Sequence, residues 1–379
     1  MSEKLEKGLE GVLVAESELS YVDGEAGRLI YRGYDIEDLT RNASYEEVLY
    51  LLWYGHLPDQ SELESFASMM SEERSVDDEI LEIVSKLAAQ DEKPMNVLRT
   101  AVSMLSAYDS DKSSYDPNDE EAILRKGRRL AAKFPTIIAA YNRFREGQDL
   151  IEPRKDLDHA ENFLYLLNGE EPDDVIAETF DMALVLHADH GFNASTFSAL
   201  ATASTLSDVH SAVTSAVGTL GGALHGGANQ DVMRMLKEVD EVDQDSVEWV
   251  ETGLKEGRRI PGFGHRVYRV KDPRAKILSQ ESENLSEAAG DAKWFEMSVA
   301  IEEYMTEHTA FAPNVDFYSA SMYSQMGIPI DLYTPIFAMS RVGGWVAHVS
   351  EYLDDNRLIR PRARYVGPKD VEFVPLEER

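Results

Sequence analysis

The stretch from residue 181 to residue 224 restricts the fold more than any other part of the chain. It reads DMALVLHADHGFNASTFSALATASTLSDVHSAVTSAVGTLGGAL and is rich in Ala, Ser, Thr and Gly, with almost no charge. A helix that lacks a polar face must be buried, either inside a domain or against a partner. We therefore predict a helix pair here that lies at a subunit interface or at the centre of the main core.

Helical spacing runs through most of the remaining sequence. Apolar residues recur three and four positions apart in segments such as SELESFASMMSEE and DDEILEIVSKLAAQ, which places them on one helix face. We expect the helix over residues 121–147 to be bent or broken at Pro135. Residues 12–33 alternate instead, which predicts a short hairpin around Asp23 and Gly24. The predicted fold class is all-α, with this short N-terminal β-hairpin.

Two domains are expected from the length of 379 residues, which is more than one simple core usually holds. The segments 236–259 and 275–309 are amphipathic and charged, as suits a smaller and more exposed domain. We predict a large helical domain formed by residues 1–227 and 322–379, and a smaller helical domain formed by residues 228–321.

The formal net charge is −33, from 70 acidic against 37 basic residues. We expect no nucleic-acid partner, because such a partner requires a positive surface, and no membrane span, because no apolar stretch is long enough. The chain contains no cysteine, which excludes disulfides, thiolate metal ligands and cysteine nucleophiles. Since the N-terminal sequence has no apolar signal core, we expect a cytoplasmic location.

The acidic residues recur on polar helix faces, as in SEERSVDDEILEIVSK, and do not form one tail. A solvated acidic surface is the simple interpretation. Adaptation to high salt is a sharper hypothesis, because about 1 M salt screens the repulsion between surface carboxylates to within about 3 Å.

The first of three unusual histidine settings is LHADHGFN, at residues 186–193. His187 and His190 are three positions apart, so on a helix they would share a face and could bind a metal. Against this, no third ligand has suitable spacing, and Asp189 would lie on another face. Alternatively, His187 is a core histidine bonded to the backbone, while His190, just before Gly191, projects into a cleft and binds an anion.

Glycines flank His225 in the second setting, LGGALHGGANQDVM. The Lys-Ser/Thr ending of a P-loop is absent, so a nucleotide triphosphate cradle is not expected. The start of the following helix disfavours an imidazolium and lowers its pKa. A neutral His225 would donate a hydrogen bond to a developing oxyanion.

The third setting, RRIPGFGHRVYRVKDPR at residues 258–274, is the most basic segment of this acidic chain. A solvated turn would not need these cations, so we predict that the segment binds a polyanionic ligand and that Arg274 holds a carboxylate through its two-pronged guanidinium. Asp316 in FAPNVDFYSA is either a helix cap or a partly desolvated base with a raised pKa. Arg341 and Arg360 add cations in apolar or tight surroundings.

These candidate residues include neutral histidines, one possible base and several arginines, but no nucleophile and no metal cage. The set suits proton abstraction next to a carbonyl group, with small carboxylates and a phosphate-bearing carrier bound by the arginines.

The motifs LHADHGFN, GALHGGANQ, PGFGHRVYRVKDPR and NVDFYSA resemble those of the citrate synthase family in their order and separations. LIYRGYDIEDL near the start and RPRARYVG near the end are also similar, so the resemblance covers nearly the whole chain. It implies an all-helical homodimer whose large and small domains close over acetyl-CoA and oxaloacetate, condense them and hydrolyse the citryl thioester. It implies no cofactor, because the CoA thioester is a substrate.

The resemblance also implies a role for each matching residue. Asp316 resembles the base that removes the acetyl methyl proton, and His225 resembles the group that stabilises the enol or enolate. His265 resembles the group that polarises and protonates the oxaloacetate carbonyl. The other matched positions bind oxaloacetate (His190, Arg274 and Arg341), reach in from the other subunit (Arg360), or meet CoA (Arg258, Arg259, Ile260, Pro261 and Gly262).

Three other functions remain open at this point. A 2-methylcitrate synthase, which uses propionyl-CoA, would share these motifs, and one methylene gives only about 1–3 kcal/mol of discrimination. A metal-dependent hydrolase would use His187 and His190. A non-catalytic acidic helical scaffold would use none of the candidate residues.

Overall fold

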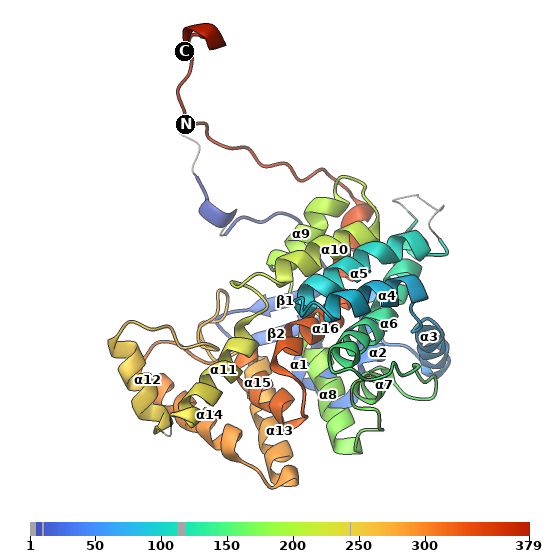
Figure 1. Cartoon of the computed structure of the whole chain (residues 1–379), viewed down its shortest axis with the longest axis vertical. Coiled ribbons are helices and arrows are strands. Elements are labelled where there is room, and N and C mark those ends of the chain that lie inside the picture. Colours follow the sequence, from blue (N-terminus) through green and yellow to red (C-terminus); the bar gives the residue numbers. More distant parts are fainter. Residues whose placement is uncertain (1–4, 10, 112–118, 243) are drawn as a thin grey trace.

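Helices build most of the molecule (Figure 1). The computed structural model describes residues 5–9, 11–111, 119–242 and 244–379. This part of the chain contains sixteen α-helices and one small sheet, which confirms the predicted all-α fold class. The helices are α1 (Ile36–Asn42), α2 (Tyr45–Tyr54), α3 (Gln60–Glu72), α4 (Asp78–Ala88), α5 (Pro94–Tyr108), α6 (Glu120–Arg145), α7 (His159–Asn168), α8 (Asp174–His187), α9 (Ala194–Ala203), α10 (Val209–Leu220), α11 (Ala228–Glu241), α12 (Ser246–Lys255), α13 (Pro273–Ala289), α14 (Lys293–His308), α15 (Val315–Gln325) and α16 (Tyr333–Asp354).

The small sheet lies near the N-terminus and has three antiparallel strands in the order β1-β2-β3. The predicted hairpin is confirmed, because β1 (Ser20–Asp23) pairs with β2 (Arg28–Tyr31). The Asp23 carboxylate holds the turn by accepting a hydrogen bond from the backbone N–H of Ala26 at 2.8 Å. A third short strand, β3 (Tyr34–Asp35), was not predicted. Three short 3₁₀ helices complete the described elements, at Lys7–Leu9, Ile330–Leu332 and Leu376–Glu378.

The last helix, α16, lies at the centre of the larger group of helices. It packs against α2, α5, α6, α8, α9 and α10, and every residue from Tyr333 to Ser350 is buried. A helix that is surrounded on all sides must be apolar all round, as this segment largely is. Arg341 and His348 are two of the exceptions, and burying them is costly unless their polar groups find partners.

A bend or a break was predicted at Pro135, and the long helix α6 continues through this residue without a break. Proline inside a helix costs about 3 kcal/mol or more, because its ring clashes with the preceding turn and its nitrogen cannot donate. Pro135 and most of the surrounding helix are buried, and α6 packs against α4, α5, α7 and α16. Burial on several sides offsets the local cost of the proline.

The uncharged stretch 181–224 contains the end of α8, followed by α9 and α10. The predicted helix pair is α9 and α10, which pack against each other and against α16. Their inner faces belong to the core, where Leu200 and Val213 are fully buried. Their outer faces carry small residues such as Ala201 and Thr214 that remain partly exposed. The pair is therefore half in the core, and its outer face is open to a partner.

A second group of helices, α11 to α14, lies on one side of the molecule (Figure 1). α11 and α13 pack on α15, and α12 packs on α14. The group meets the larger one where α13 contacts α1 and α8, and where α11 contacts α16. The predicted domain boundary at residue 321 falls inside α15, so a boundary after Gln325 would leave that helix whole.

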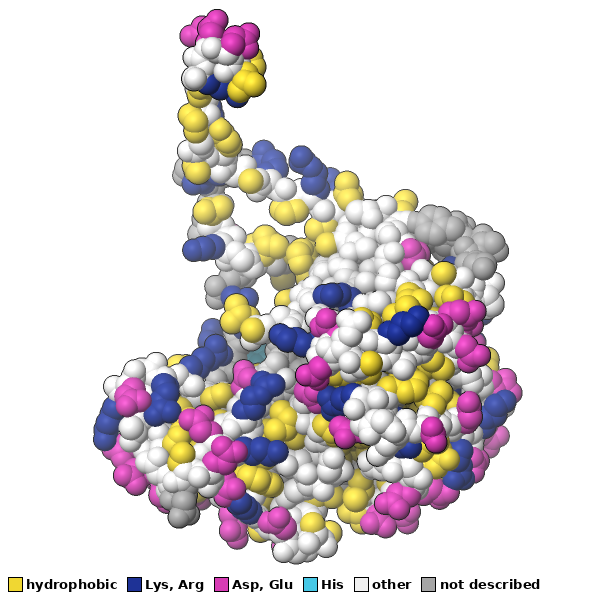
Figure 2. All heavy atoms as spheres, viewed as in Figure 1, with side chains coloured by type: hydrophobic (Ala, Val, Ile, Leu, Met, Phe, Trp, Pro, Cys, Tyr) yellow, Lys and Arg dark blue, Asp and Glu magenta, His cyan; other side chains and the backbone are white. Residues whose placement is uncertain are grey.

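The surface has two further features. Acidic side chains spread over the outer faces of both helix groups (Figure 2). The segment after α16 leaves the helical body as an extended tail (Figure 1), in which Val366, Phe373 and Leu376 are 89%, 79% and 77% exposed. Within the described ranges, none of the helices has the length and apolar character needed to cross a membrane.

Candidate active site

His225 lies in the loop between α10 and α11, beside the start of α9. Its Nε2 accepts a hydrogen bond from the backbone N–H of Ser195 at 3.2 Å and lies 2.9 Å from Ser195 Oγ. A ring nitrogen that accepts from a backbone amide carries no proton, so the geometry assigns the proton to Nδ1. Burial, followed by the charge of Arg341, lowers the pKa of His225 to about 4. The ring is therefore neutral at pH 7 and offers one N–H donor.

His265 presents the opposite nitrogen. Its Nδ1 accepts hydrogen bonds from the backbone N–H groups of Val267 and Tyr268, at 3.0 and 3.1 Å. The proton is thus assigned to Nε2. Burial, followed by the charge of Arg274, lowers the pKa of His265 to about 4. The site therefore has a second neutral N–H donor.

His190 lies beside His265, with their ring centroids 5.2 Å apart. Its Nε2 is 3.3 Å from the hydroxyl of Tyr268. Burial, followed by the charge of Arg274, lowers the pKa of His190 well below its usual range. His190 is therefore a neutral group on the wall of the same site, in a position to hydrogen-bond a substrate oxygen.

The metal hypothesis required His187 and His190 to share a helix face. α8 ends at His187, so the two residues do not lie on one helix. His187 is buried, and its Nδ1 lies 2.7 Å from the carbonyl oxygen of Ala183, as in the alternative interpretation of a core histidine. No group of three His, Asp or Glu side chains in the described part of the chain is arranged to hold a metal ion, so the hydrolase hypothesis has no ligand set there.

Arg274 lies in the first turn of α13 and is 2% exposed. Its Nε and Nη2 donate to the Asp272 carboxylate at 3.0 and 2.7 Å. Burial acts to lower the pKa of this guanidinium, but Asp272 raises it. This two-pronged contact is made with a carboxylate of the protein itself, whereas a ligand carboxylate was predicted, and it fixes the position of Arg274.

Arg341 is 1% exposed and comes from the centre of α16. Its Nε donates to the carbonyl oxygen of His187 at 2.6 Å, and its guanidinium lies 4.6 Å from the ring centroid of Phe337. Its buried Nη2 has no hydrogen-bond partner among the described residues. Burial lowers the pKa of Arg341 to about 10. A buried guanidinium N–H without an acceptor is expected where an anionic ligand binds.

Asp316 lies in the first turn of α15. The cap of this helix is Asn314, whose Oδ1 accepts from the backbone N–H of Asp316 at 3.0 Å, so Asp316 is not the cap. Its Oδ1 is buried and has no hydrogen-bond partner within the described ranges. Burial raises the pKa of Asp316 to about 7, which is the direction predicted for a base.

Two loop segments hold His265 and Asp316 in register. The backbone N–H of Gly264 donates to the carbonyl oxygen of Ala312, and the N–H of Asn314 donates to the carbonyl oxygen of Gly262, both at 2.9 Å. The Asn314 side-chain amide also donates to the Gly264 carbonyl oxygen at 2.9 Å. Asn314 therefore joins the loop that carries His265 to the helix that carries Asp316.

One region of the structure gathers most of the predicted site residues. Arg274 or Arg341 shifts the pKa of each titratable group among them, and such interactions weaken with distance. The residues brought together are His190, His225, His265, Arg274, Asp316 and Arg341.

Arg360 is not part of this group, because it lies exposed in the extended tail.

The predicted CoA loop borders the site through its last residue, Gly262. A Cβ at this position would come within 2.8 Å of Val232 and 2.7 Å of Phe317. Arg258 packs over the Trp249 ring at 4.6 Å.

The other members of the CoA loop differ in exposure. Arg258 pairs with Glu256 at 3.1 Å, whereas the Arg259 side chain is exposed and makes no hydrogen bond or ion pair with the described part of the chain. Ile260 is buried, and Pro261 is partly buried. Of the two arginines in the loop, Arg258 is therefore held by its contacts, and Arg259 is free to contact a ligand.

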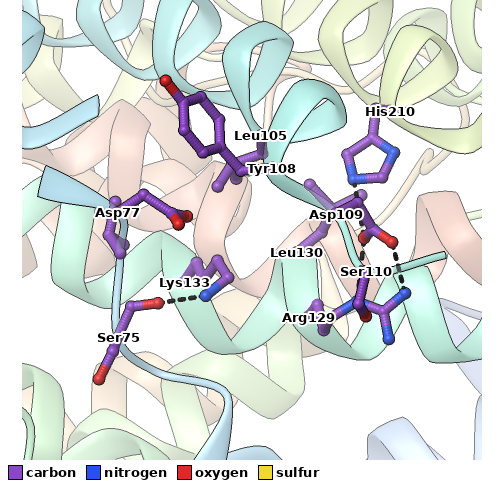
Figure 3. Close-up of a pocket in the computed structure, with 11 residues that line it drawn as sticks. Ser75, Asp77, Leu105, Tyr108, Asp109, Ser110, Arg129, Leu130, Lys133 and His210 are labelled. Atoms are coloured by element: carbon purple, nitrogen blue, oxygen red, sulfur yellow. Dashed lines mark hydrogen bonds and ion pairs between the residues drawn. The ribbon is translucent and has the colours of Figure 1, made fainter. Parts of the chain in front are cut away.

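A cavity of about 280 Å³ lies elsewhere, between α5, α6 and the start of α10 (Figure 3). None of the candidate site residues lines it. Four of its polar side chains already have partners: Asp109 contacts Arg129 at 2.7 Å and His210 at 3.4 Å, and Lys133 donates to the carbonyl oxygen of Ser75. The candidate active site is therefore identified by its chemistry and not by cavity size.

Several residues of the site were missed by the sequence analysis. Ser195 and Tyr268 contact the histidines, Asp272 holds Arg274, and Asn314 links the two loops. A local signal existed for Asp272, because an Asp just before a Pro at the first helical position is a typical N-cap. The other contacts depend on the tertiary fold.

Comparison with known proteins gives the family. The family described as citrate synthase, C-terminal domain, matches residues 8–362. A citrate synthase from Haloferax volcanii is 65% identical over 379 residues, covering 100% of both chains. The structure of a citrate synthase from Thermoplasma acidophilum, in ternary complex with carboxymethyl coenzyme A and oxaloacetate, has a TM-score of 0.93 at 32% identity and covers 100% of each chain.

A 2-methylcitrate synthase from Shewanella oneidensis is less similar, at 41% identity over 374 residues that cover 98% of this chain and 97% of that protein. The family match spans most of this chain, and the Haloferax citrate synthase aligns with all of it. The chain therefore belongs to the citrate synthase family.

Proposed function

We propose that the protein condenses acetyl-CoA with oxaloacetate and water to give citrate and CoA, as an acyltransferase that needs no cofactor. The observation that carries the proposal is the Asp316 carboxylate, whose Oδ1 is buried and has no partner among the described residues, in a site that also holds His225 and His265 as neutral N–H donors. Such a set suits enolisation of a thioester followed by addition to a ketone.

In the first step, Asp316 removes a proton from the acetyl methyl group. A pKa of about 7 makes the carboxylate a stronger base than an exposed aspartate while leaving about half of the population ionised at pH 7. The C–H electron pair moves toward the thioester carbonyl, where negative charge develops on oxygen. His225 donates its Nδ1–H to this oxygen, and a donor fixed before the reaction contributes a few kcal/mol, about 3.

In the second step, the enol or enolate carbon forms a C–C bond with the ketone carbon of oxaloacetate. The ketone oxygen gains the electron pair of its π bond and takes the proton on His265 Nε2. The proton that Asp316 took from the methyl group replaces the one that His265 gave up, so His265 is neutral and Asp316 is a carboxylate again after the addition. Citryl-CoA is the product of this addition. Water then hydrolyses its thioester in the same closed site, which releases citrate and CoA.

Oxaloacetate needs cations for its two carboxylates. Arg341 supports this assignment because its buried Nη2 has no acceptor in the described chain. Arg274 is held by Asp272 and contributes positive charge close to His190, His265 and Asp316. His190 adds a neutral hydrogen-bonding group. We assign the oxaloacetate site to His190, Arg274 and Arg341.

The loop from Arg258 to Gly262 is proposed to meet CoA. The large domain (residues 1–227 and 322–379) carries His225, and the small domain (residues 228–321) carries His265 and Asp316. Closure of the two domains would bring these groups around the substrates and exclude water until condensation is complete.

We propose that the enzyme is a homodimer in which Arg360 completes the site of the partner. The exposed tail supports this, because its apolar side chains, such as Val366 and Phe373, are left without cover in the described chain. The outer face of α9 and α10 offers small, partly exposed residues for the interface.

A cytoplasmic location and adaptation to high salt belong to the same proposal. The net charge is −33, and acidic side chains are spread over the face of the molecule seen in Figure 2. At molar salt the repulsion among these carboxylates is screened within about 3 Å, compared with about 10 Å at 0.1 M.

Release of CoA from acetyl-CoA in the presence and absence of oxaloacetate tests the proposal. A thiol reagent reports this release without background from the protein, because the chain has no cysteine. We expect His225→Ala, His265→Ala and Asp316→Ala to remain folded dimers whose turnover falls by about 10²–10⁴. Near-normal turnover in one of the three would remove the role assigned to that residue, and no oxaloacetate-dependent release in the wild type would remove the proposal.

The choice between acetyl-CoA and propionyl-CoA needs a separate measurement. The greater similarity to a citrate synthase than to a 2-methylcitrate synthase favours acetyl-CoA. We expect kcat/KM to be higher for acetyl-CoA, and a higher value for propionyl-CoA would assign the protein to the alternative.

A further inference from the structure

One face of α16 holds the loop that joins α8 to α9. The residues of this face are Arg341, Trp345 and His348, whose spacing of four and three places them in one stripe. Arg341 Nε donates to the carbonyl oxygen of His187, and Trp345 Nε1 donates to Ser195 Oγ at 3.1 Å. His348 Nε2 lies 3.1 Å from a carboxylate oxygen of Asp189. The helix thus contacts the connection at its beginning (His187), within the loop (Asp189) and just after it, at the start of α9 (Ser195).

Asp189 is the centre of this arrangement and is fully buried. Its Oδ2 accepts hydrogen bonds from Ser20 Oγ at 2.5 Å and from the backbone N–H of Gly191 at 3.1 Å. The hydroxyl of Tyr31 donates to the Asp189 carbonyl oxygen at 2.7 Å. His190, which is assigned to the substrate, therefore lies between two residues whose backbone is held by hydrogen bonds: Asp189 through its carbonyl oxygen and Gly191 through its N–H.

His348 is the partner that makes a buried carboxylate possible at this position. Burial would raise the pKa of Asp189, but the contact with His348, the charge of Arg341 and the hydrogen bond from Ser20 hold it at about 2. His348 is itself 1% exposed, and its ring packs edge-on against Phe192 at 5.2 Å. A charge-assisted contact in such surroundings is strong and directional.

The helix approaches this loop too closely for any side chain to intervene. At Gly344, a Cβ would collide with the carbonyl oxygen of Ala188 and would lie 2.7 Å from Asp189 Oδ1. Because α16 and the loop are in direct contact, a shift of one against the other would change the distance between the His190 and Arg341 side chains.

We propose that Asp189 and His348 are positioning residues of the oxaloacetate site, which fix the spacing between His190 and Arg341 from behind. Both side chains are buried, at 0% and 1% exposed, and are proposed to act on oxaloacetate only through the loop that they hold. The inference rests on the proposed function, since it assigns His190 and Arg341 to oxaloacetate. It concerns recognition of the keto acid and leaves the CoA loop unaffected.

Two variants of His348 test the proposal. His348→Gln keeps an N–H donor near the position of Nε2, whereas His348→Leu removes it. We expect His348→Leu to raise the KM for oxaloacetate about ten- to hundredfold, with the KM for acetyl-CoA changed by less than about threefold. We expect the increase in the KM for oxaloacetate in His348→Gln to be at most about half of that in His348→Leu on a logarithmic scale, because the glutamine N–H can still donate to the Asp189 carboxylate.

A matched control separates positioning from general loss of packing. His210 is also a buried histidine beside a carboxylate, 3.4 Å from Asp109, but it lines the cavity in Figure 3, away from the site. We expect His210→Leu to leave the KM for oxaloacetate within about threefold of the wild type, even if it lowers the melting temperature. Equal effects of His348→Leu and His210→Leu on that KM would overturn the proposal.

Calorimetric titration with oxaloacetate provides a readout that does not depend on turnover. The Kd for oxaloacetate should weaken in His348→Leu by the same factor as the KM, about ten- to hundredfold. An unchanged Kd overturns the positioning role. If the wild-type protein binds oxaloacetate but releases no CoA, the proposed function is contradicted. The positioning role of Asp189 and His348 is then still decided by the Kd values of the wild type and His348→Leu.

Discussion

Replacing Asp316 by asparagine should stabilise the protein at the pH where the enzyme works. The carboxylate is poorly solvated, since its Oδ1 is buried without a partner among the described residues, and burial raises its pKa from 3.8 to about 7. The folded chain therefore keeps a proton that the unfolded chain releases. The contribution of Asp316 to the free energy of unfolding falls as the pH rises from about 4 to about 7, and is constant above that range.

The magnitude follows from the shift. A change from 3.8 to about 7 corresponds to about 4 kcal/mol at pH 8, at about 1.4 kcal/mol for each pKa unit. The residue keeps partial contact with solvent, which screens its charge, so we expect about half of this, about 2 kcal/mol. At pH 5 most of the wild-type population is still protonated, and the gain should be below about 1 kcal/mol.

Urea unfolding of wild type and Asp316→Asn, followed by tryptophan fluorescence at pH 5 and pH 8, measures both values. Asp149→Asn is the control, because Asp149 lies exposed in the loop after α6 and should change stability by less than about 0.5 kcal/mol at either pH. Turnover of Asp316→Asn should fall by about 10²–10⁴. An asparagine variant that is no more stable than wild type at pH 8, relative to pH 5, refutes the argument that this carboxylate is held in an unfavourable environment for use as a base.

Three further predictions address the loops and the surface. Asn314→Ala removes both the N-cap of α15 and the hydrogen bond to the Gly264 carbonyl oxygen. Urea unfolding should show a free energy of unfolding that is lower by about 1–2 kcal/mol. Turnover should fall more than in Asp245→Ala, a control that removes the N-cap of α12. Because Arg258 is engaged by Trp249 and Glu256, Arg259→Ala should raise the KM for acetyl-CoA more than Arg258→Ala does, and equal or absent effects would favour contact through the loop backbone. The melting temperature should rise when KCl is increased from about 0.1 M to about 2 M, as the screening length falls from about 10 Å toward 3 Å, whereas a flat or falling profile would contradict salt adaptation.

Local patterns predicted most of the fold and failed where distant contacts decide. The helical spacing and the hairpin turn depend on neighbouring residues, and the corresponding elements are present. His187 and His190 do not share a helix face, as the metal hypothesis required, because α8 ends at His187. The loop after it is held by Asp189, whose partners Ser20 and His348 lie 169 and 159 residues away in sequence. At Pro135, burial on several sides of α6 outweighs the local cost of proline.

The identity of the candidate site residues was accessible from the sequence, but their electrostatic state was only partly so. The motifs indicated neutral histidines and a raised pKa for Asp316, and the pKa shifts have these directions. The main cause in each case is burial, which depends on the complete fold. The partner of Arg274 was expected to be a substrate carboxylate, whereas the structure gives it Asp272, two residues away.

The opposite tautomers of the two histidines lead to a final test of the mechanism. His225 uses Nε2 as an acceptor and donates from Nδ1, whereas His265 uses Nδ1 as an acceptor and donates from Nε2. An asparagine amide nitrogen lies near the position of Nδ1, and a glutamine amide nitrogen lies near that of Nε2. His225→Asn should therefore retain at least about tenfold more turnover than His225→Gln, and His265→Gln at least about tenfold more than His265→Asn. If both positions prefer the same amide, the assignment of a separate donor nitrogen to each histidine is wrong, because residue size alone would then explain the result.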